Sequence, residues 1–208
     1  MSDELIVVVK RDCPTCTLVE SVYAVLVDGQ VPTTVYSQDD ATFPENVADV
    51  VDDTELEVSY RLDIEFVPTL IRMSDGKETG RAVGWHRAEW SALAGTDPLG
   101  VGLPESQPGC GARNVEPGAR ERLMVRFGDS NLSARSIALG AYDDPLESCF
   151  ERGWTDGLPV VPPTDERIVR MLAGTTRSAD ELVGKIPPNY ADCTVEKVAI
   201  NAVMAGCR

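Results

Sequence analysis

The sequence predicts an α/β fold, with a central mixed sheet flanked by helices, over about the first hundred residues, and a mostly helical region after it. Residues Leu5–Val9 form an unbroken apolar run rich in β-branched side chains, typical of a strand buried on both faces of a sheet. From Val19 onward, apolar side chains recur at i, i+3, i+4 and i+7, which predicts a helix with one apolar stripe. A second strand is expected at Thr33–Ser37, and the strand-helix-strand order predicts parallel pairing through a right-handed crossover.

The remaining elements of this first part follow from turn and cap signals. The acidic stretch Gln38–Asp53 is broken by Pro44, so we expect a loop with a short helix there. Ser74–Lys77 is a turn signal inside an expected hairpin, and Gly95 closes the last helix in a C′ position. The other expected elements are a helix at Thr54–Leu62, strands at Phe66–Ile71 and Arg81–Trp85, and a helix at His86–Ala94.

Charge and composition divide the chain into parts. Residues 1–100 carry a net charge of −12 and residues 101–208 carry −3, which indicates two units with different surfaces. Residues 97–118 are rich in glycine and proline. We therefore expect a first domain at residues 1–96, a linker at 97–118 and a mostly helical region at 119–208.

The expected elements of the second region are marked by caps and helical spacing. They are a short helix or strand at Arg120–Phe127 and helices at Asp144–Arg152, from the N-cap Thr164 to Leu172, after the capping-box sequence Ser178–Glu181, and from Val195 to Gly206. The last of these helices presents a stripe of small residues and ends near Arg208 without a C-cap. This pattern indicates a truncated chain or a second domain completed by further sequence or by another subunit; a short C-terminal helix is the alternative.

The composition excludes several classes of protein. The chain has 208 residues and a net charge of −15, so phosphate backbones and anionic membrane surfaces repel it; neither a nucleic-acid nor a membrane partner is expected. No run approaches the ~18 apolar residues of a membrane span. The N-terminus has no basic leader, and six cysteines are too few for a disulfide-stapled secreted scaffold. We expect a cytoplasmic protein whose cysteines are mostly thiols.

The motif that carries chemistry is Cys-Pro-Thr-Cys at residues 13–16, between the first strand and the first helix. Free N–H groups and the positive dipole end of a helix N-terminus stabilise an anion, which predicts an acidic, nucleophilic thiol at Cys13. Pro14 fits the first helical turn because its missing N–H costs nothing there. Cys16 lies about one turn further on, close enough to resolve a mixed disulfide formed on Cys13.

Residues 4–95 resemble the thioredoxin and glutaredoxin superfamily. Besides the Cys-Pro-Thr-Cys motif, the stretch Arg61–Leu70 resembles the segment that leads into the cis-proline strand of that family, and Ser74–Gly84 resembles the hairpin after it. The resemblance implies a thioredoxin-like fold with thiol-disulfide exchange at Cys13 and Cys16. It also implies that Pro68 is cis and faces the cysteine pair.

The same resemblance implies a substrate groove. The backbone of Val67 would bind an extended peptide, and Gly84 would leave room beside the site. Three features depart from thioredoxins: Asp12 stands where they carry tryptophan, the preceding strand lacks their buried carboxylate, and the stretch of residues 38–53 is longer and more acidic. Because of these departures, thioredoxin reductase is not assigned as the electron donor.

Other interpretations of these residues remain open. The cysteine pair also fits half of a zinc site or a structural disulfide, although no second Cys-x-x-Cys exists and His86 is the one histidine. His86 reads as a surface residue at a helix start. Cysteines 149, 193 and 207 read as small apolar groups. Cys110, between two glycines, is a candidate additional redox residue. The loop Trp154–Pro163 fits either a ligand site or a packed connection.

The function expected from the sequence is thiol-disulfide exchange with a disulfide-containing protein or a small thiol substrate, in cell redox homeostasis. A thiol reductant or a reductase would supply electrons, and no cofactor or metal is expected. The alternative is a non-catalytic thioredoxin-like interaction or delivery module of a larger enzyme, with the active site in the C-terminal region.

Overall fold

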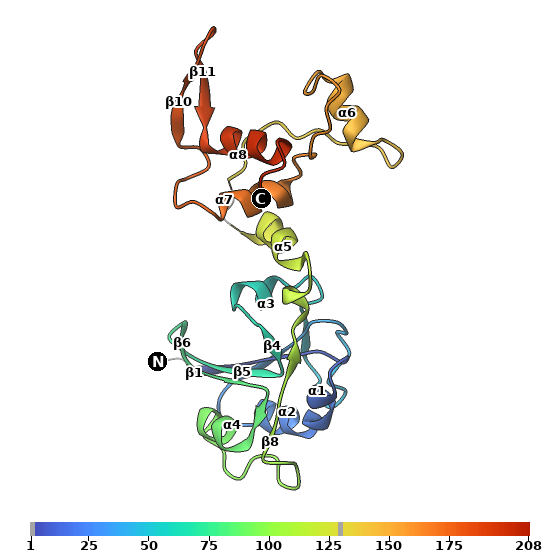
Figure 1. Ribbon diagram of the computed structural model, residues 1–208. Coiled ribbons are helices and arrows are strands. Elements are labelled where there is room, and N and C mark those ends of the chain that lie inside the picture. The colour runs from blue at the N-terminus through green and yellow to red at the C-terminus, as the bar shows by residue number, and fades with distance from the viewer. Residues whose placement is uncertain (1–2, 129–130) are drawn as a thin grey trace. The chain divides into compact units, whose positions relative to one another are not determined.

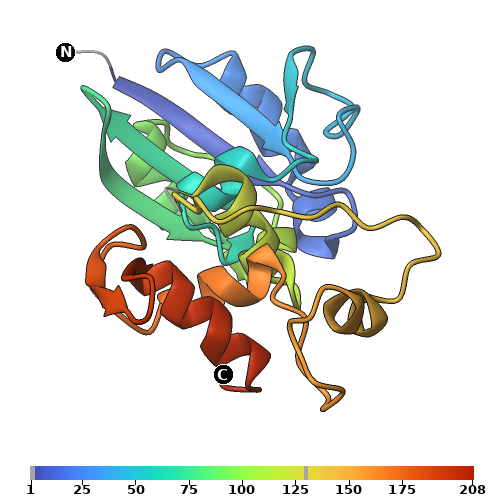
Figure 2. The ribbon, with the colours of Figure 1, turned by 90° about the horizontal axis from the view of Figure 1, so that it is seen from above.

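The computed structural model describes residues 3–128 and 131–208, and the chain divides into two compact units, Met1–Leu123 and Met124–Arg208. The first unit is built on a five-stranded mixed sheet. Its strands lie in the order β3-β2-β1-β5-β6, and Figure 2 shows β1 between β2 and β5. The strand bounds are β1 Asp3–Val9, β2 Thr33–Ser37, β3 Val50–Asp52, β5 Thr69–Ser74 and β6 Lys77–Val83.

The direction of each strand follows from the connection that precedes it. β1 runs parallel to β2, and β2 runs parallel to β3. β5 is antiparallel to both β1 and β6, and the turn at Asp75–Gly76 joins β5 to β6. The predicted parallel crossover and the predicted hairpin are therefore confirmed, and a central mixed sheet flanked by helices is the architecture that the resemblance implies.

Helices cover both faces of this sheet. In Figure 1, α1, α2 and α4 lie on one face and α3 lies on the other. Their bounds are α1 Pro14–Leu18, α2 Glu20–Val27, α3 Glu57–Arg61 and α4 Arg87–Ala94. Val7, Val8 and Val9 of β1 are fully buried, as expected for the central strand of a sheet covered on both faces. Gly95 ends α4 in the left-handed conformation that its predicted C′ position requires.

Two local predictions for the first unit are corrected. In the acidic stretch, where we expected a loop with a short helix, the chain makes turns and then the edge strand β3, because residues 50–52 pair with the end of β2. The helix expected at Thr54–Leu62 is limited to α3, since Leu56 before it has a positive φ of 63°. Short-range patterns do not reveal a strand that owes its existence to a distant partner.

Residues 106–115, within the expected linker, pack against the first unit. β8 (Ser106–Gln107) pairs with β7 (Trp85–His86), and β9 (Cys110–Gly111) pairs with β4 (Phe66–Val67), both antiparallel. A 3-10 helix at Arg113–Val115 follows. Figure 1 shows this part of the chain running from β8 past β4.

A buried polar network fixes the far end of this segment. The Gln38 side chain is fully buried; its Nε2 donates to Ser59 Oγ at 2.7 Å and to Asn114 Oδ1 at 3.1 Å, and its Oε1 accepts from the N–H of Arg113 at 3.0 Å. Asn114 Nδ2 donates in turn to the carbonyl of Ile64 at 2.6 Å. Because buried polar groups need partners, these bonds tie residues 113–114 to the sheet and to α3.

The second unit contains helices and a β-hairpin. Its elements are the end of α5 (Ala119–Phe127), α6 (Pro145–Glu151), α7 (Asp165–Leu172), β10 (Leu182–Ile186), β11 (Ala191–Thr194) and α8 (Val195–Met204). Thr164 is the N-cap residue of α7, as predicted. The helix expected after Ser178 is wrong: Ser178 and Glu181 close a turn, and the chain enters β10, which pairs with β11. A mostly helical description of this unit is therefore not established.

A buried carboxylate organises part of the second unit. Glu196, in the first turn of α8, is 1% exposed. It accepts hydrogen bonds from the N–H of Ser133 at 3.0 Å, from Ser133 Oγ at 2.8 Å and from the N–H of Ala134 at 2.9 Å. Across the ranges 3–128 and 131–208, no helix has the length and apolar character needed to cross a membrane.

The network around Gln38 predicts an effect on stability. Asn114→Ala leaves the Ile64 carbonyl and one Gln38 N–H buried without their partner, which lowers the free energy of unfolding by about 1–3 kcal/mol. The matched control is Asn46→Ala, because Asn46 makes its bond to the Glu20 carbonyl on the surface; that change stays within about 0.5 kcal/mol. Urea unfolding followed by tryptophan fluorescence measures both, and equal losses would contradict the role of the network.

Candidate functional site

Cys13 is the N-cap residue of α1. Its backbone is extended, and its Sγ accepts a hydrogen bond from the N–H of Cys16 at 3.4 Å. Pro14 occupies the first helical position, where no N–H is needed. The turn from β1 into α1 therefore aims the sulfur of Cys13 at the free N–H groups of the helix start, as the sequence predicts.

A second element meets the same sulfur. The thiol of Cys13 donates to the carbonyl oxygen of Val67 at 3.5 Å, and the Val67–Pro68 peptide bond is cis, as the resemblance implies. Cys13 is 1% exposed and Cys16 is fully buried. The cysteine pair thus lies beneath the surface, at the junction of α1 and β4.

A third sulfur lies beside Cys13. Cys110 is the residue of β9 opposite Val67 in the antiparallel register, and its thiol lies close enough to that of Cys13 for each to shift the pKa of the other. Cys110 is partly exposed, whereas Cys13 is not. All six cysteines are free, and the structure brings together Cys13, Cys16 and Cys110; the other three are residues of the second unit.

The three thiols differ in acidity. A hydrogen bond from the Cys16 thiol, a second from the Cys110 thiol, and the N–H groups of Cys16 and Thr15 lower the pKa of Cys13 to about 5, although burial acts against them. Burial raises the pKa of Cys16 far above its ordinary range, and the hydrogen bond and charge of Cys13 add to this. Burial also raises the pKa of Cys110. Near neutral pH the thiolate is therefore on Cys13, and the hydrogen bond from the Cys13 thiol to the Val67 carbonyl belongs to the protonated form.

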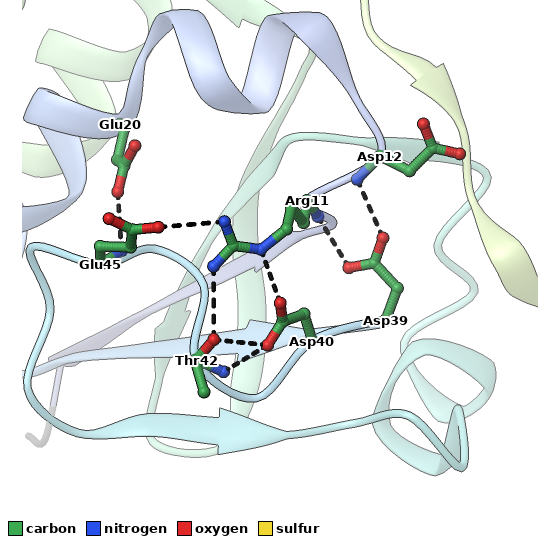
Figure 3. Close-up of polar contacts among 7 residues, drawn as sticks. All are labelled: Arg11, Asp12, Glu20, Asp39, Asp40, Thr42 and Glu45. Atoms are coloured by element: carbon green, nitrogen blue, oxygen red, sulfur yellow. Dashed lines mark hydrogen bonds and ion pairs between the residues drawn. The ribbon is translucent and has the colours of Figure 1, made fainter.

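The loop that leads into the motif is held by the acidic stretch of residues 39–45 (Figure 3). The Asp39 carboxylate accepts from the N–H groups of Arg11 and Asp12, at 2.7 and 2.9 Å. The Arg11 guanidinium donates to Asp40 at 2.6 Å and to Glu45 at 3.1 Å. The acidic residues of this stretch therefore have a definite task, which is to fix the backbone immediately before Cys13.

Two residues of the site escaped the sequence reasoning. Tyr23 is expected as part of an apolar stripe, but its hydroxyl donates to the carbonyl of Cys16 at 3.1 Å. Thr15, the residue before Cys16, donates from Oγ1 to the carbonyl of Pro108 at 2.6 Å. The signal for Tyr23 is its hydroxyl, a polar group within the apolar stripe of α2 that needs a partner once it is buried.

The N–H of Gly84 donates to the carbonyl of Pro68 at 2.8 Å, and the space above Gly84 is filled by residues 107–109. Its φ is +70°, and a Cβ there would lie 2.8 Å from the N of Gly109 and 3.0 Å from the carbonyl oxygen of Gln107. The carbonyl of Gly84 accepts from Nε1 of the buried Trp90 at 2.9 Å. Gly84 therefore allows the segment around Gly109 to approach β4 closely.

The remaining candidates of the sequence lie elsewhere. His86 is exposed and precedes α4, away from the thiols. Within residues 3–128 and 131–208, no group of three or more His, Cys, Asp or Glu side chains is arranged to hold a metal ion. In the second unit, Trp154, Pro162 and Pro163 line a hollow of about 1090 Å³ together with Glu196. This is the loop expected either to pack or to line a ligand site.

The solved structures that are similar to this chain include one from Bacillus subtilis. StoA from Bacillus subtilis, known from a crystal structure, aligns with 45% of this chain and 82% of its own chain at 14% sequence identity, with a TM-score of 0.36. No family model and no curated protein matches the chain.

Proposed function

We propose that the first unit catalyses thiol-disulfide exchange, with Cys13 as the nucleophile and Cys16 as the resolving thiol. The observation that carries this proposal is the Cys13 sulfur at the start of α1, accepting from the Cys16 N–H, with its pKa lowered to about 5. A thiolate at neutral pH is what a disulfide substrate requires for attack.

The reaction has two exchange steps. The Cys13 thiolate attacks one sulfur of a substrate disulfide, a bond forms between Cys13 and that sulfur, and the other sulfur leaves as a thiolate. Cys16 then attacks the Cys13 sulfur, which forms the Cys13–Cys16 disulfide and releases the second substrate thiol. In the mixed disulfide Cys13 has no charge, so one cause that raises the pKa of Cys16 is gone when Cys16 must act.

The proposed substrate is a protein disulfide or a small disulfide, and a thiol reductant or a reductase returns the pair to the dithiol form. The proposed substrate contacts are the Val67 backbone beside Pro68 and the open space that Gly84 would give once the segment above it moves. A reducing, cytoplasmic setting is part of the proposal, in line with the sparse cysteines of the sequence.

A second candidate function has its own support. The burial of Cys13 and the hollow in the second unit fit a first unit that binds or delivers, with chemistry in the second. In that case the first unit does not reduce disulfides, and replacing Cys13 changes no rate of disulfide reduction. One assay separates the two candidates.

The assay is the reduction of insulin disulfides by dithiothreitol in the presence of the full chain. Wild type accelerates the reduction, and Cys13→Ser returns it to the uncatalysed rate because no other thiolate replaces the one at the helix start. Cys207→Ser is the matched control, since Cys207 is an exposed thiol of the second unit. It keeps the wild-type rate.

Two results would overturn the proposed function. One is equal acceleration by wild type and Cys13→Ser; the other is no acceleration by the wild-type chain. Retained folding of Cys13→Ser is checked by its circular dichroism, so that a lost rate reports the thiol.

A further inference from the structure

Residues 105–112, here named the covering segment, lie along the edge of β4, where they pair with the backbone of Val67. Ser106 and Gln107 pair with β7, and Cys110 and Gly111 pair with β4. The register sets Cys110 opposite Val67, whose carbonyl accepts from the Cys13 thiol. The chain therefore supplies an extended strand to its own site in the manner of strand addition by a peptide ligand.

The covering segment is held at several points along its length. The N–H of Arg87 donates to the Glu105 carbonyl at one end, and the N–H of Ala112 donates to the Glu65 carbonyl at the other, both at 2.9 Å. Lys10 Nζ donates to the Gly111 carbonyl at 3.0 Å. Strand pairing with β7 and β4 and a hydrogen bond from Thr15 Oγ1 to the Pro108 carbonyl hold the residues between these ends, so the segment is fixed along its whole length.

The backbone of the covering segment lies directly against the backbone of β4. A Cβ on Gly109 would lie 2.7 Å from the Val67 carbonyl oxygen and 3.3 Å from Gly84 Cα. By contrast, a Cβ on Gly111 would meet nothing within 4 Å. Gly109 is thus a position where only a glycine lets the segment reach β4, and no further strand fits between them.

We propose that the covering segment is an internal substrate: it occupies the peptide-binding edge beside Val67 and brings Cys110 into disulfide exchange with Cys13. The inference rests on the proposed function, because it needs a reactive Cys13. Beyond the proposed function, it gives Cys13 a second disulfide partner, Cys110. It also requires that a peptide substrate displace the covering segment before it can bind beside Val67.

The internal exchange balances without an external oxidant or reductant. Starting from the Cys13–Cys16 disulfide, the Cys110 thiolate attacks the Cys13 sulfur, the Cys13–Cys110 bond forms, and the Cys13–Cys16 bond breaks. Cys16 leaves as a thiolate and takes up the proton that Cys110 gave up. Lys10, which lies close enough to lower the pKa of Cys110 against the effect of burial, favours the attacking thiolate.

The same chemistry resolves a mixed disulfide on Cys13. When Cys13 carries glutathione, attack by Cys110 on the Cys13 sulfur forms Cys13–Cys110 and releases glutathione as a thiol. Trypsin separates the two partners, because Cys13 lies in the peptide 12–61 and Cys110 in the peptide 88–113. The bond is therefore visible as a cross-link between two peptides.

The first experiment uses the full chain with Cys16→Ser, treated with oxidised glutathione and digested without reduction. The expected result is a cross-link between peptides 12–61 and 88–113 and little glutathione left on Cys13. In the control Cys16→Ser/Cys110→Ser, glutathione stays on Cys13. An equally persistent adduct in both variants would overturn the internal substrate and leave the proposed function standing. Neither adduct nor cross-link in either variant would overturn the proposed function and this inference together.

The second experiment compares two glycines of the covering segment. Gly109→Ala forces the segment off β4, so iodoacetamide reaches Cys13 about tenfold faster than in Gly111→Ala, where the added Cβ meets nothing. Fragmentation of peptide 12–61 locates the label on Cys13. Gly111→Ala reacts at the wild-type rate, and equal rates in the two variants would overturn a segment that covers the site.

Discussion

The sulfur of Cys13 is the point on which the rest of the first unit depends. It accepts from the Cys16 N–H at the start of α1 and lies 3.5 Å from the Val67 carbonyl oxygen. β1 must end, α1 must begin, and β4 must pass at the same place for these contacts to form. The mixed sheet makes this possible. β1 is parallel to β2 and antiparallel to β5, so the end of β1 and the start of β5 lie at the same edge of the sheet.

This interaction also explains why three thiols so close together behave differently. Burial is the main cause that raises the pKa of Cys16 and of Cys110, and a negative charge on Cys13 at the helix start raises both further. The acidic stretch before β3 contributes by fixing the backbone that precedes Cys13 through Asp39. Some of the many acidic side chains of the first unit thus accept hydrogen bonds within the protein.

Much of the site could be predicted from the sequence because its signals are local. A buried strand, a polar turn and a Cys-Pro-Thr-Cys helix start lie within residues 5–16, and the segment around Pro68 follows a recognisable order. The covering segment could not be predicted as such, since its glycines and prolines are also the composition of a linker. Its strands β8 and β9 exist because β7 and β4 offer them partners, and such partners are distant in sequence.

The second unit illustrates the same limit. The helices expected at Asp144–Arg152 and from Thr164 to Leu172 are present as α6 and α7, and the Asp144 side chain caps the first of them, an interaction decided within one turn of the helix. The sequence Ser178–Glu181 has the spacing of a capping box, yet a strand and not a helix follows it, because β10 pairs with β11. The buried Glu196 has no local signature either, since its partners Ser133 and Ala134 lie more than sixty residues away along the chain.

The most direct test of this account is the ionisation of Cys13 in the reduced chain. The measurement is the ultraviolet absorbance of the thiolate as a function of pH, taken as the difference between wild type and Cys13→Ser. The account predicts a transition at about pH 5, because the pKa of Cys13 is lowered by its thiol and N–H donors. A transition near the ordinary thiol value of about 8.5 would contradict it.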